Sequence, residues 1–542
     1  METLINFNIK SDWWLTMRRS KTSHLLENWL SLRFRLFLEG IIIGVLTGTV
    51  IVFYRVMLVH AETLRGNVYY IMQNRSWWII PIWFFALICL GYLLGRACKK
   101  EPLLGGSGIP QVKGIIWGRI KSNWVTVLIG KFIGSLLAVG GGLSLGRGAP
   151  SIQMGAAIAQ GVSRNLGRLR IEEKYLITCG TSAGLAAAFN APLAGVIFAI
   201  EEMHKNLSPL LLTSALAASL SADLVSRHFF GQKPVFYFAD LPVLPLSHYP
   251  YLLILGLLMG LFGVYFNYCL QKSLNFYQNS GLPIEFRPIL PLIAAGIIGF
   301  FLPQVLGGGD TLINELSTLN IALSTLVILV IFKFFFTMFS YGSGVPGGIF
   351  LPLLVIGALS GSIFGGLIIK YLNVNPQYLH NFIIYAMAAY LTAIIKAPIT
   401  GSILLTEMTG SFNHLLATLV VSMSAYLVSD LLKSRPIYEV LLERLMKKDG
   451  WSEYKPDAHD NKVIMEIPVC LNSELDRKRV KDISWPKGCL LVSLKRGESE
   501  IIPKGDTLIH VGDHLVVLTS ENSETSDSNL LTHLAGECLD KK

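Results

Sequence analysis

Long apolar runs dominate the chain up to about residue 446, and short polar stretches separate them. Clear examples are residues 41–52, 77–94, 252–261, 321–338 and 383–395. Several are long enough, with their flanks, to cross a hydrocarbon core about 30 Å thick. Others are short or interrupted by Gly and Pro, and a bilayer tolerates such irregular backbone only where protein or a water-filled cavity covers it. The pattern predicts an all-α polytopic membrane protein with broken or tilted helices.

The pattern changes at both ends of this membrane domain, which we place at residues 33–446. Residues 1–32 contain Trp13, Trp14 and Trp29 and predict an N-terminal amphipathic helix at the membrane interface. Residues 447–462 form a polar linker. Beyond it, residues 463–542 predict a small cytoplasmic α/β domain that is rich in β-strands, because apolar segments at 463–469, 490–494 and 515–518 are separated by Gly and Asp turns.

The composition supports a membrane protein. Of the 542 residues, 52% are hydrophobic and 15% are charged, whereas about 25% are charged in a typical soluble domain. The net charge of +10 comes from cations between the apolar segments, such as Arg164, Arg168, Arg170 and Lys174 in one loop. This placement favours a positive-inside orientation over nucleic-acid binding. We expect a multi-pass protein of the plasma (inner) membrane with both termini in the cytoplasm.

The remaining composition gives no sign of a cofactor. The seven cysteines are scattered without the spacing of a metal site, so we interpret them as unpaired thiols and expect no metal. The N-terminal residues lack the short apolar core and small-residue cleavage site of a signal peptide.

The membrane domain contains a weak internal repeat. Residues 188–201 and 394–407 each contain a chain break, Ala-Pro, Gly, an apolar turn and then a glutamate at the same offset, Glu201 or Glu407. Chance similarity between apolar segments is the alternative, but the shared break and carboxylate favour duplication. Paired broken segments in two halves of a chain indicate a transport site near the membrane midplane.

Glycine-rich breaks precede apolar helical runs at residues 105–110, 146–153 and 342–352. Pro at or near the first turn suits a helix start, because its missing N–H would be unpaired there anyway. Free backbone N–H groups and the partial positive charge of a helix N-terminus attract an anion more mildly than a buried Lys or Arg. Conduction needs such moderate binding. One such segment alone is equally consistent with a helix cap, but three together favour an anion site.

These segments resemble the selectivity-filter motifs of the CLC family of chloride channels and proton/chloride exchangers. The matching residues are Gly106-Ser107-Gly108-Ile109-Pro110, the Gly-Arg-x-x-Pro of 146–150, Gly347-Gly348-Ile349-Phe350-x-Pro352, Gly180–Gly184 and Pro436-Ile437-Tyr438. The resemblance implies an inverted repeat of broken helices, a homodimer with one pore per subunit, and chloride as the transported ion. It places chloride at the side chains of Ser107 and Tyr438 and near the backbone of Gly108, Ile109, Gly148, Ala149, Ile349 and Phe350. Taken alone, Tyr438 is more readily explained as a packing residue.

The second motif departs from the family, which usually has glutamate where this chain has Gly148. That glutamate competes with chloride and carries protons, so we expect the outer site to be permanently open and transport to be uncoupled and channel-like. Glu202 resembles the inner proton-transfer glutamate of the exchangers, which leaves open a proton-coupled antiporter with a non-standard outer path. We interpret Glu201 and Glu407 as structural acids, and the filter resembles chloride-type rather than fluoride-type members.

Residues 463–520 resemble the RCK C-terminal (TrkA-C) domain. The resemblance rests on Met465–Pro468, Ile501–Leu508 and Gly512–Leu518. It implies dimerisation and the binding of a small regulator, in some cases cyclic di-AMP. A purely structural dimerisation role remains the alternative.

Two other classes of protein are disfavoured. Gly180-Thr181-Ser182-Ala183-Gly184 matches the nucleophile elbow of hydrolases, but that motif requires a strand-to-helix turn and here interrupts an apolar helical region. We therefore expect no enzyme activity. A cation transporter is also disfavoured, because the pore motifs lack the carbonyl-lined filter loops of potassium channels.

Overall fold

The chain divides into two compact units, Met1–Leu445 and Met446–Lys542, and each is described by itself. The computed structural model describes residues 21–74, 77–205, 208–238, 241–318, 321–448, 462–470, 473–486, 489–497, 499–520 and 534–535.

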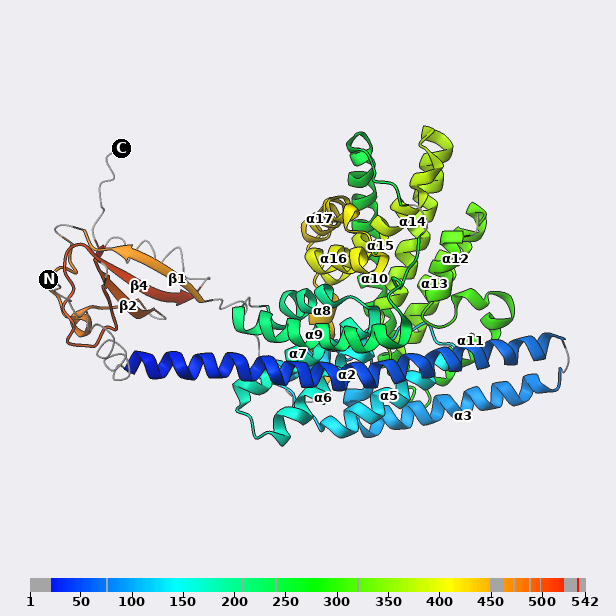
Figure 1. Cartoon of the computed structure of the whole chain (residues 1–542), viewed down its shortest axis with the longest axis horizontal. Coiled ribbons are helices and arrows are strands. Elements are labelled where there is room, and N and C mark those ends of the chain that lie inside the picture. The colour runs from blue at the N-terminus through cyan, green and yellow to red at the C-terminus, as the bar shows by residue number, and fades with distance from the viewer. Residues whose placement is uncertain are drawn as a thin grey trace, which may run out of the picture. The chain divides into compact units, whose positions relative to one another are not determined.

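The described part of the first unit is built from α-helices, shown in Figure 1. They are α2 (Lys21–Asn74), α3 (Ile79–Lys100), α4 (Ile109–Ile116), α5 (Trp124–Gly140), α6 (Gly148–Asn165), α7 (Arg170–Phe189), α8 (Pro192–Phe198), α9 (Pro209–Phe230), α10 (Tyr249–Asn279), α11 (Ile289–Phe301), α12 (Asp310–Thr318), α13 (Leu323–Gly342), α14 (Phe350–Leu372), α15 (Leu379–Ile395), α16 (Pro398–Thr409), α17 (Leu415–Leu431) and α18 (Ile437–Lys448). A π-helical turn, η2 (Ala199–His204), follows α8.

Eight of the described helical segments are long and apolar enough to cross a membrane. They are Arg33–Asn74, Ile79–Lys100, Pro209–Phe230, Leu246–Asn279, Leu323–Gly342, Phe350–Leu372, Pro376–Ile395 and Phe412–Leu431. Other helices are too short to span it, such as α4 with 8 residues and α8 with 7. The prediction of a multi-pass membrane protein with broken helices is therefore confirmed.

A pair of buried lysines supports the predicted duplication. Lys131 on α5 donates from Nζ to the carbonyls of Leu104 and Gly106, at 3.0 and 2.7 Å. Lys333 on α13 donates in the same way to the carbonyls of Val305 and Gly307, each at 2.9 Å. In both halves, a lysine of one helix thus holds the loop that leads into the short helix before it, α4 or α12.

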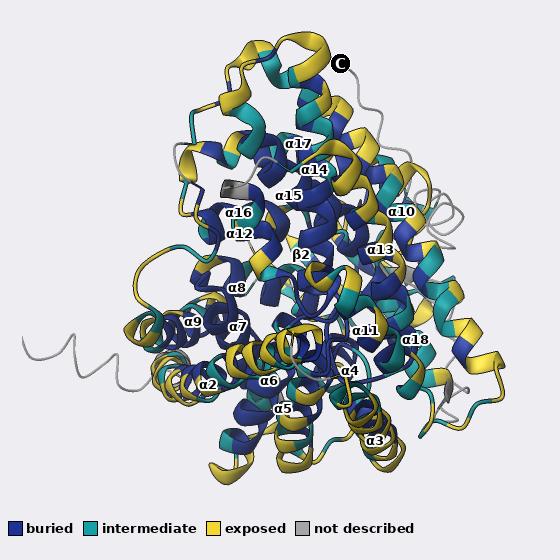
Figure 2. Ribbon diagram, turned by 90° about the vertical axis from the view of Figure 1, so that its right-hand side faces the viewer, coloured by how far each residue is buried: buried dark blue, intermediate teal, exposed yellow. Residues whose placement is uncertain are grey.

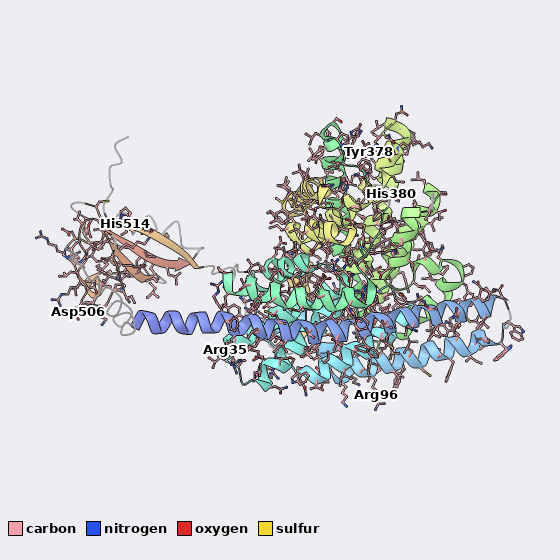
Figure 3. The ribbon with its side chains drawn as sticks, in the orientation of Figure 1. Arg35, Arg96, Tyr378, His380, Asp506 and His514 are labelled. Carbon is pink, nitrogen blue, oxygen red and sulfur yellow. The ribbon has the colours of Figure 1, made fainter. Side chains whose placement is uncertain are left out.

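Helices α14 and α15 lie largely in the interior of this unit. All residues from Asn381 to Ile395 on α15 are buried, and α15 packs against α14, α10 and α17. Both α14 and α15 are largely dark blue in Figure 2. At the surface, Arg35 on α2 and Arg96 on α3 are exposed and labelled in Figure 3.

The predicted interfacial helix cannot be compared in full with the structure. Residues 1–20, with Trp13 and Trp14, lie outside the described residues. From Lys21 the chain is continuous with α2, and the side chains of residues 21–32, including Trp29, are not described. The amphipathic character of this segment stays a prediction.

The second unit contains one antiparallel sheet, as its alternating pattern predicted. Its strands are β1 (Lys462–Pro468), β2 (Leu490–Arg496), β3 (Ser499–Ile501) and β4 (Asp513–Ser520), in the order β1-β4-β2-β3. β1 pairs with β4 from Lys462↔Ser520 to Pro468↔His514. Inward side chains form a separate apolar core that includes Leu494, Leu515 and Val517.

The second unit also contains ion pairs at its surface and a disulfide-bonded cysteine. His514 on β4 faces Glu466, with Nδ1 3.2 Å from Oε1, and Asp506 pairs with Lys481 at 2.6 Å; both His514 and Asp506 are labelled in Figure 3. Cys470 is disulfide-bonded, so the expectation that all cysteines are unpaired is wrong for this residue.

Candidate anion pathway

The three glycine-rich segments, although far apart in the sequence, meet in the structure. Gly106 donates to the carbonyl of Val345 at 3.0 Å, and Gly347 donates to the carbonyl of Gly106 at 3.1 Å. Gly146 and Gly348 exchange two backbone hydrogen bonds of 2.7 and 3.1 Å. An added Cβ at Gly146, Gly347 or Gly348 would lie 2.6 Å from a side-chain atom of Leu351, Leu145 or Ala149, respectively, so packing around this junction requires glycine. The segment at 342–352 thus joins the other two.

Three helices start at this junction. α4 starts at Ile109 after Gly108, α6 starts at Gly148 after Arg147, and α14 starts at Phe350 after Ile349. Gly108 has φ of +94°, and a Cβ there would lie 2.2 Å from Oε1 of Gln153. Only glycine fits this turn. The N-termini bring unpaired N–H groups and partial positive charge to one buried region.

All eight residues predicted to surround the anion are buried: Ser107, Gly108, Ile109, Gly148, Ala149, Ile349, Phe350 and Tyr438. Seven of them belong to the three segments just described. Tyr438 comes from α18 instead, and its hydroxyl is buried without a hydrogen-bond partner among the described residues. A buried unpaired hydroxyl costs about 1–3 kcal/mol, and an anion that accepts a hydrogen bond from this hydroxyl would remove that cost.

The space beside Gly148 is filled by a residue that the sequence analysis missed. A Cβ added to Gly148 would lie 2.6 and 2.7 Å from Cε2 and Cζ of Phe189. The Phe189 ring stacks on Phe350 with centroids 5.6 Å apart, and the Arg147 guanidinium carbon lies 5.9 Å from its centroid. Gly148 therefore faces the Phe189 ring rather than empty space, and the permanently open outer site stays a prediction. No pattern along the chain pointed to this contact between α6 and α7.

Glu202 lies in the π-helical turn η2 and is buried. Its carboxylate is 2.9 Å from Nζ of Lys113, which is fully buried on α4 and lies 3.6 Å from Glu439. Glu439 also pairs with Lys205. The inner carboxylate is thus ion-paired within a network of four charges, a partnership that spacing in the sequence did not reveal.

Glu201 and Glu407 each cap the start of a short helix in the other repeat. The carboxylate of Glu201 accepts the backbone N–H groups of Ile399 and Thr400 at 3.3 and 2.7 Å. Glu407 accepts those of Leu193 and Ala194 at 3.0 and 2.8 Å. Each acid therefore satisfies the start of the short helix in the other half, which supports their interpretation as structural acids.

The hydrolase-like motif lies in the interior of α7, which runs from Arg170 to Phe189. Ser182 donates to the carbonyl of Ala215 at 3.4 Å. A serine inside a helix is not displayed on the strand-to-helix turn that a nucleophile elbow needs. This placement disfavours the interpretation of the motif as a nucleophile elbow.

Comparisons with known proteins identify the class. The profile described as voltage-gated chloride channel matches residues 95–430, and that of the TrkA-C domain matches residues 464–525. The chain is 32% identical over 439 residues to the H(+)/Cl(−) exchange transporter ClcA of Vibrio cholerae, with 76% of this chain and 90% of that protein covered. The same transporter of Vibrio parahaemolyticus is 33% identical over 444 residues, with 77% and 91% covered.

Solved structures agree in fold. The X-ray structure of a slow cyanobacterial Cl⁻/H⁺ antiporter has a TM-score of 0.74 at 29% identity, covering 77% of this chain and 99% of that one. A CLC-type fluoride/proton antiporter has a TM-score of 0.62 at 23% identity, covering 73% and 95%, and shows the fold alone. The chain belongs to the voltage-gated chloride channel (CLC) family and carries a C-terminal TrkA-C domain. Membership of this family supports chloride transport across a membrane, and the Vibrio relatives named above are exchange transporters rather than enzymes.

Proposed function

We propose that this protein conducts chloride passively, without coupling to protons, through a pathway at the three glycine-rich helix starts. The single observation that carries this proposal is Gly148 at the first position of α6, where its family usually has a titratable glutamate. A glycine has no proton to exchange. The pathway therefore has no carboxylate at its outer gate position.

The anion site combines the groups predicted from the sequence. Backbone N–H groups near Gly108, Ile109, Gly148, Ala149, Ile349 and Phe350 supply the helix-end field, and Ser107 and Tyr438 supply hydroxyl donors. Support comes from the hydrogen-bonded junction of the three segments and from the unpartnered Tyr438 hydroxyl. Such neutral donors bind an anion weakly enough for release.

The state of Glu202 also supports uncoupled transport. Its ion pair with Lys113 at 2.9 Å stabilises the deprotonated carboxylate. Lys113 thus opposes the protonation that burial of Glu202 favours, which argues against free exchange of protons at this carboxylate. The alternative is proton-coupled antiport through Glu202 and a non-standard outer path, and it is favoured by the names of the ClcA relatives.

Chloride and proton movements measured together decide between these mechanisms. Liposomes containing the full chain are given an outward chloride gradient, and chloride efflux and internal pH are recorded together. We expect chloride efflux that a potassium ionophore accelerates, with no uphill proton uptake. Proton uptake driven by the chloride gradient would contradict passive conduction. A flux series with fluoride and a chloride-versus-potassium reversal potential test the ion selectivity.

The proposal also covers the oligomeric state, the location and the regulation of the protein. It acts as a homodimer in the plasma (inner) membrane, with both termini in the cytoplasm, as the family resemblance and the loop cations suggest. The TrkA-C domain, residues 464–525, regulates the pore by binding a small ligand such as cyclic di-AMP. Subunit counting in lipid tests the dimer, and titration of the full chain with cyclic dinucleotides tests the ligand. Absence of binding would leave the domain a dimerisation role.

A further inference from the structure

An ion pair links the start of α6 to the start of α12. Nη1 of Arg147, the residue before Gly148, contacts Oδ2 of Asp310, the first residue of α12. The two side chains are only 14% and 26% exposed. Nε of Arg147 and Oδ1 of Asp310 are both buried without a hydrogen-bond partner among the described residues. Because little water surrounds them, the two charges interact more strongly than those of a surface pair.

Arg147 places a positive charge next to the candidate anion pathway. Its guanidinium carbon lies 5.9 Å from the centroid of the Phe189 ring, which stands beside Gly148. The buried lysines near the helix starts, Lys131 and Lys333, donate instead to backbone carbonyls. A full cation holds an anion more tightly than helix ends do, and conduction requires release. Release is therefore easier when the charge of Arg147 is balanced.

The internal repeat places the balancing carboxylate at a telling position. The carbonyls of Gly106 and Gly307 accept hydrogen bonds from the two buried lysines in the same way. Three residues later, Ile109 starts α4 in the first half and Asp310 starts α12 in the second half. Ile109 is a predicted anion-binding position. The second half thus has a fixed carboxylate where the first half is expected to bind chloride, and a helix N-terminus stabilises such a negative charge.

The backbone before α12 fixes this carboxylate in place. Gly309 has φ of +90°, and a Cβ there would lie 2.9 Å from Cγ2 of Val355 on α14. The loop therefore packs directly on α14, whose first residue, Phe350, belongs to the junction of the three glycine-rich segments. Since the loop and the junction are packed on the same helix, Asp310 is held at a constant distance from Arg147.

Two further charged side chains flank the same loop. A Cβ added to Gly307 would lie 2.7 Å from Oε1 of Glu62 and 3.3 Å from Nη2 of Arg65, both on α2. They bring one formal charge of each sign. Asp310 is the acid that contacts the Arg147 guanidinium directly, so its removal changes the charge next to the pathway most.

We propose that Asp310 is a positioning residue for chloride transport, which holds the Arg147 guanidinium and neutralises its charge at the start of α6. Chloride then meets mainly the milder field of the helix ends and is released. Without the carboxylate, Arg147 adds its full charge to the attraction, so chloride binds more tightly and leaves more slowly. This inference rests on the proposed passage of chloride along the three glycine-rich helix starts.

Chloride binding is tested first, because it does not depend on transport. The full chain is titrated calorimetrically with chloride at constant ionic strength, with gluconate as the replacement anion. We expect Asp310→Asn to lower the Kd about 3-fold or more, and Asp310→Glu, which keeps the charge, to stay within about 2-fold of the original. If the effect acts through Arg147, Asp310→Asn should change the Kd less than about 2-fold in an Arg147→Gln background.

A matched control and a folding test accompany these variants. Asp223 on α9 also pairs with an arginine, Arg227, and its Oδ1 is also buried without a partner among the described residues. Asp223→Asn is therefore expected to leave the chloride Kd unchanged. Size-exclusion profiles identify variants that fail to fold. In that case Asp310→Ser replaces Asp310→Asn, because serine also suits a helix start, and Arg147→Met replaces Arg147→Gln.

Efflux from liposomes gives the second readout. The chloride concentration for half-maximal efflux should fall with Asp310→Asn by the same factor as the Kd, and the maximal rate should fall because release is slower. The inference is overturned if Asp310→Asn leaves the Kd unchanged, if Asp310→Glu shifts it equally, or if the shift persists without Arg147. It is also overturned if Asp223→Asn gives the same shift. Proton uptake driven by chloride in the original chain would refute passive conduction alone, and the Kd values would still decide the role of Asp310.

Discussion

The ring of Phe189 stands where a side chain at Gly148 would begin, with Cε2 2.6 Å from the ideal Cβ position. Phe189 ends α7 and Gly148 starts α6, and these two helices pack against each other. An uncharged ring from a neighbouring helix therefore occupies the space where a side chain at position 148 would begin. An apolar group at a narrow point restricts ions by excluding water.

The first prediction is that Phe189→Ala accelerates chloride efflux several-fold. Removing the ring opens the space beside Gly148 and Phe350 and lets water follow the anion. The cavity costs about 3–5 kcal/mol of stability, so the melting temperature must be recorded with the flux. Phe262→Ala is the control, because Phe262 stacks on Phe334 and Tyr390 instead. Equal acceleration in both variants would attribute the effect to loosening of the fold.

The second prediction is that Gly148→Glu slows efflux at pH 7 and that efflux recovers as the pH falls. The new side chain must displace the Phe189 ring, and its carboxylate competes with chloride for the helix-end donors until it is protonated. Gly148→Gln is the matched variant, because it has nearly the same size and no charge. We expect Gly148→Gln to be slow at every pH from 7 to 4.5. Parallel pH profiles for the two variants would refute carboxylate competition.

The third prediction concerns the unpartnered hydroxyl on α18. Tyr438→Phe is expected to weaken chloride binding about 10-fold, which corresponds to about 1.4 kcal/mol and lies near the lower end for a hydrogen bond to a charged group. Calorimetric titration of the full chain with chloride measures this. Tyr390→Phe is the control, since the hydroxyl of Tyr390 is also buried without a partner among the described residues but lies outside the predicted site. Equal losses would show that the hydroxyl of Tyr438 is not a specific ligand.

The sequence predicted those parts of the fold that local chemistry encodes. Gly and Pro located the starts of α4, α6 and α14, and the equal offsets of Glu201 and Glu407 revealed the duplication. The alternation after residue 462 likewise predicted β1, β2 and β4, which the structure confirms. In each case the signal lies within a few residues of the feature.

Other features depend on contacts between distant segments and left no local signal. The motif places Gly148 at the position where the family usually has glutamate. Only the packing of α6 on α7 brings Phe189 beside it. The pairing of Lys113 with Glu202 joins α4 to η2 across 89 positions. Such relationships follow from tertiary packing rather than from any pattern along the chain.

The fourth prediction tests an ion pair of the TrkA-C domain. Asp513 on β4 is 1% exposed and binds Arg496 through two contacts of 2.8 Å. Burial raises the pKa of Asp513, but the hydrogen bonds from Arg496 and from the backbone N–H of His510 outweigh it and hold the pKa below its usual range. Because the folded-state pKa is depressed, the stabilisation is fully present above the unfolded pKa of about 3.9 and is lost as the pH falls through the folded value.

Hydrogen exchange of β4 amides in the full chain, corrected for intrinsic rates, measures this stability. Asp513→Asn is expected to cost about 1.5–3 kcal/mol at pH 7, toward the lower end because Arg496 is 41% exposed. Protection in the original chain should be constant from pH 7 to about 5 and fall below pH 4. Asp506→Asn, at an exposed position, should change little. Equal effects of the two substitutions would show that the buried pair has no special role.

The fifth prediction tests whether the ion pair between Lys113 and Glu202 contributes to stability. Lys113→Met leaves Glu202 buried without its partner, and breaking a buried ion pair from one side costs about 3–5 kcal/mol. Glu202→Gln alone leaves Lys113 near Glu439, which lies 3.6 Å away, so its cost is smaller. The double variant is expected to recover most of the melting temperature lost in Lys113→Met, because no unpaired carboxylate remains. If the losses of the two single variants simply add in the double variant, Lys113 and Glu202 are not energetically coupled, and the argument that Lys113 opposes protonation of Glu202 fails.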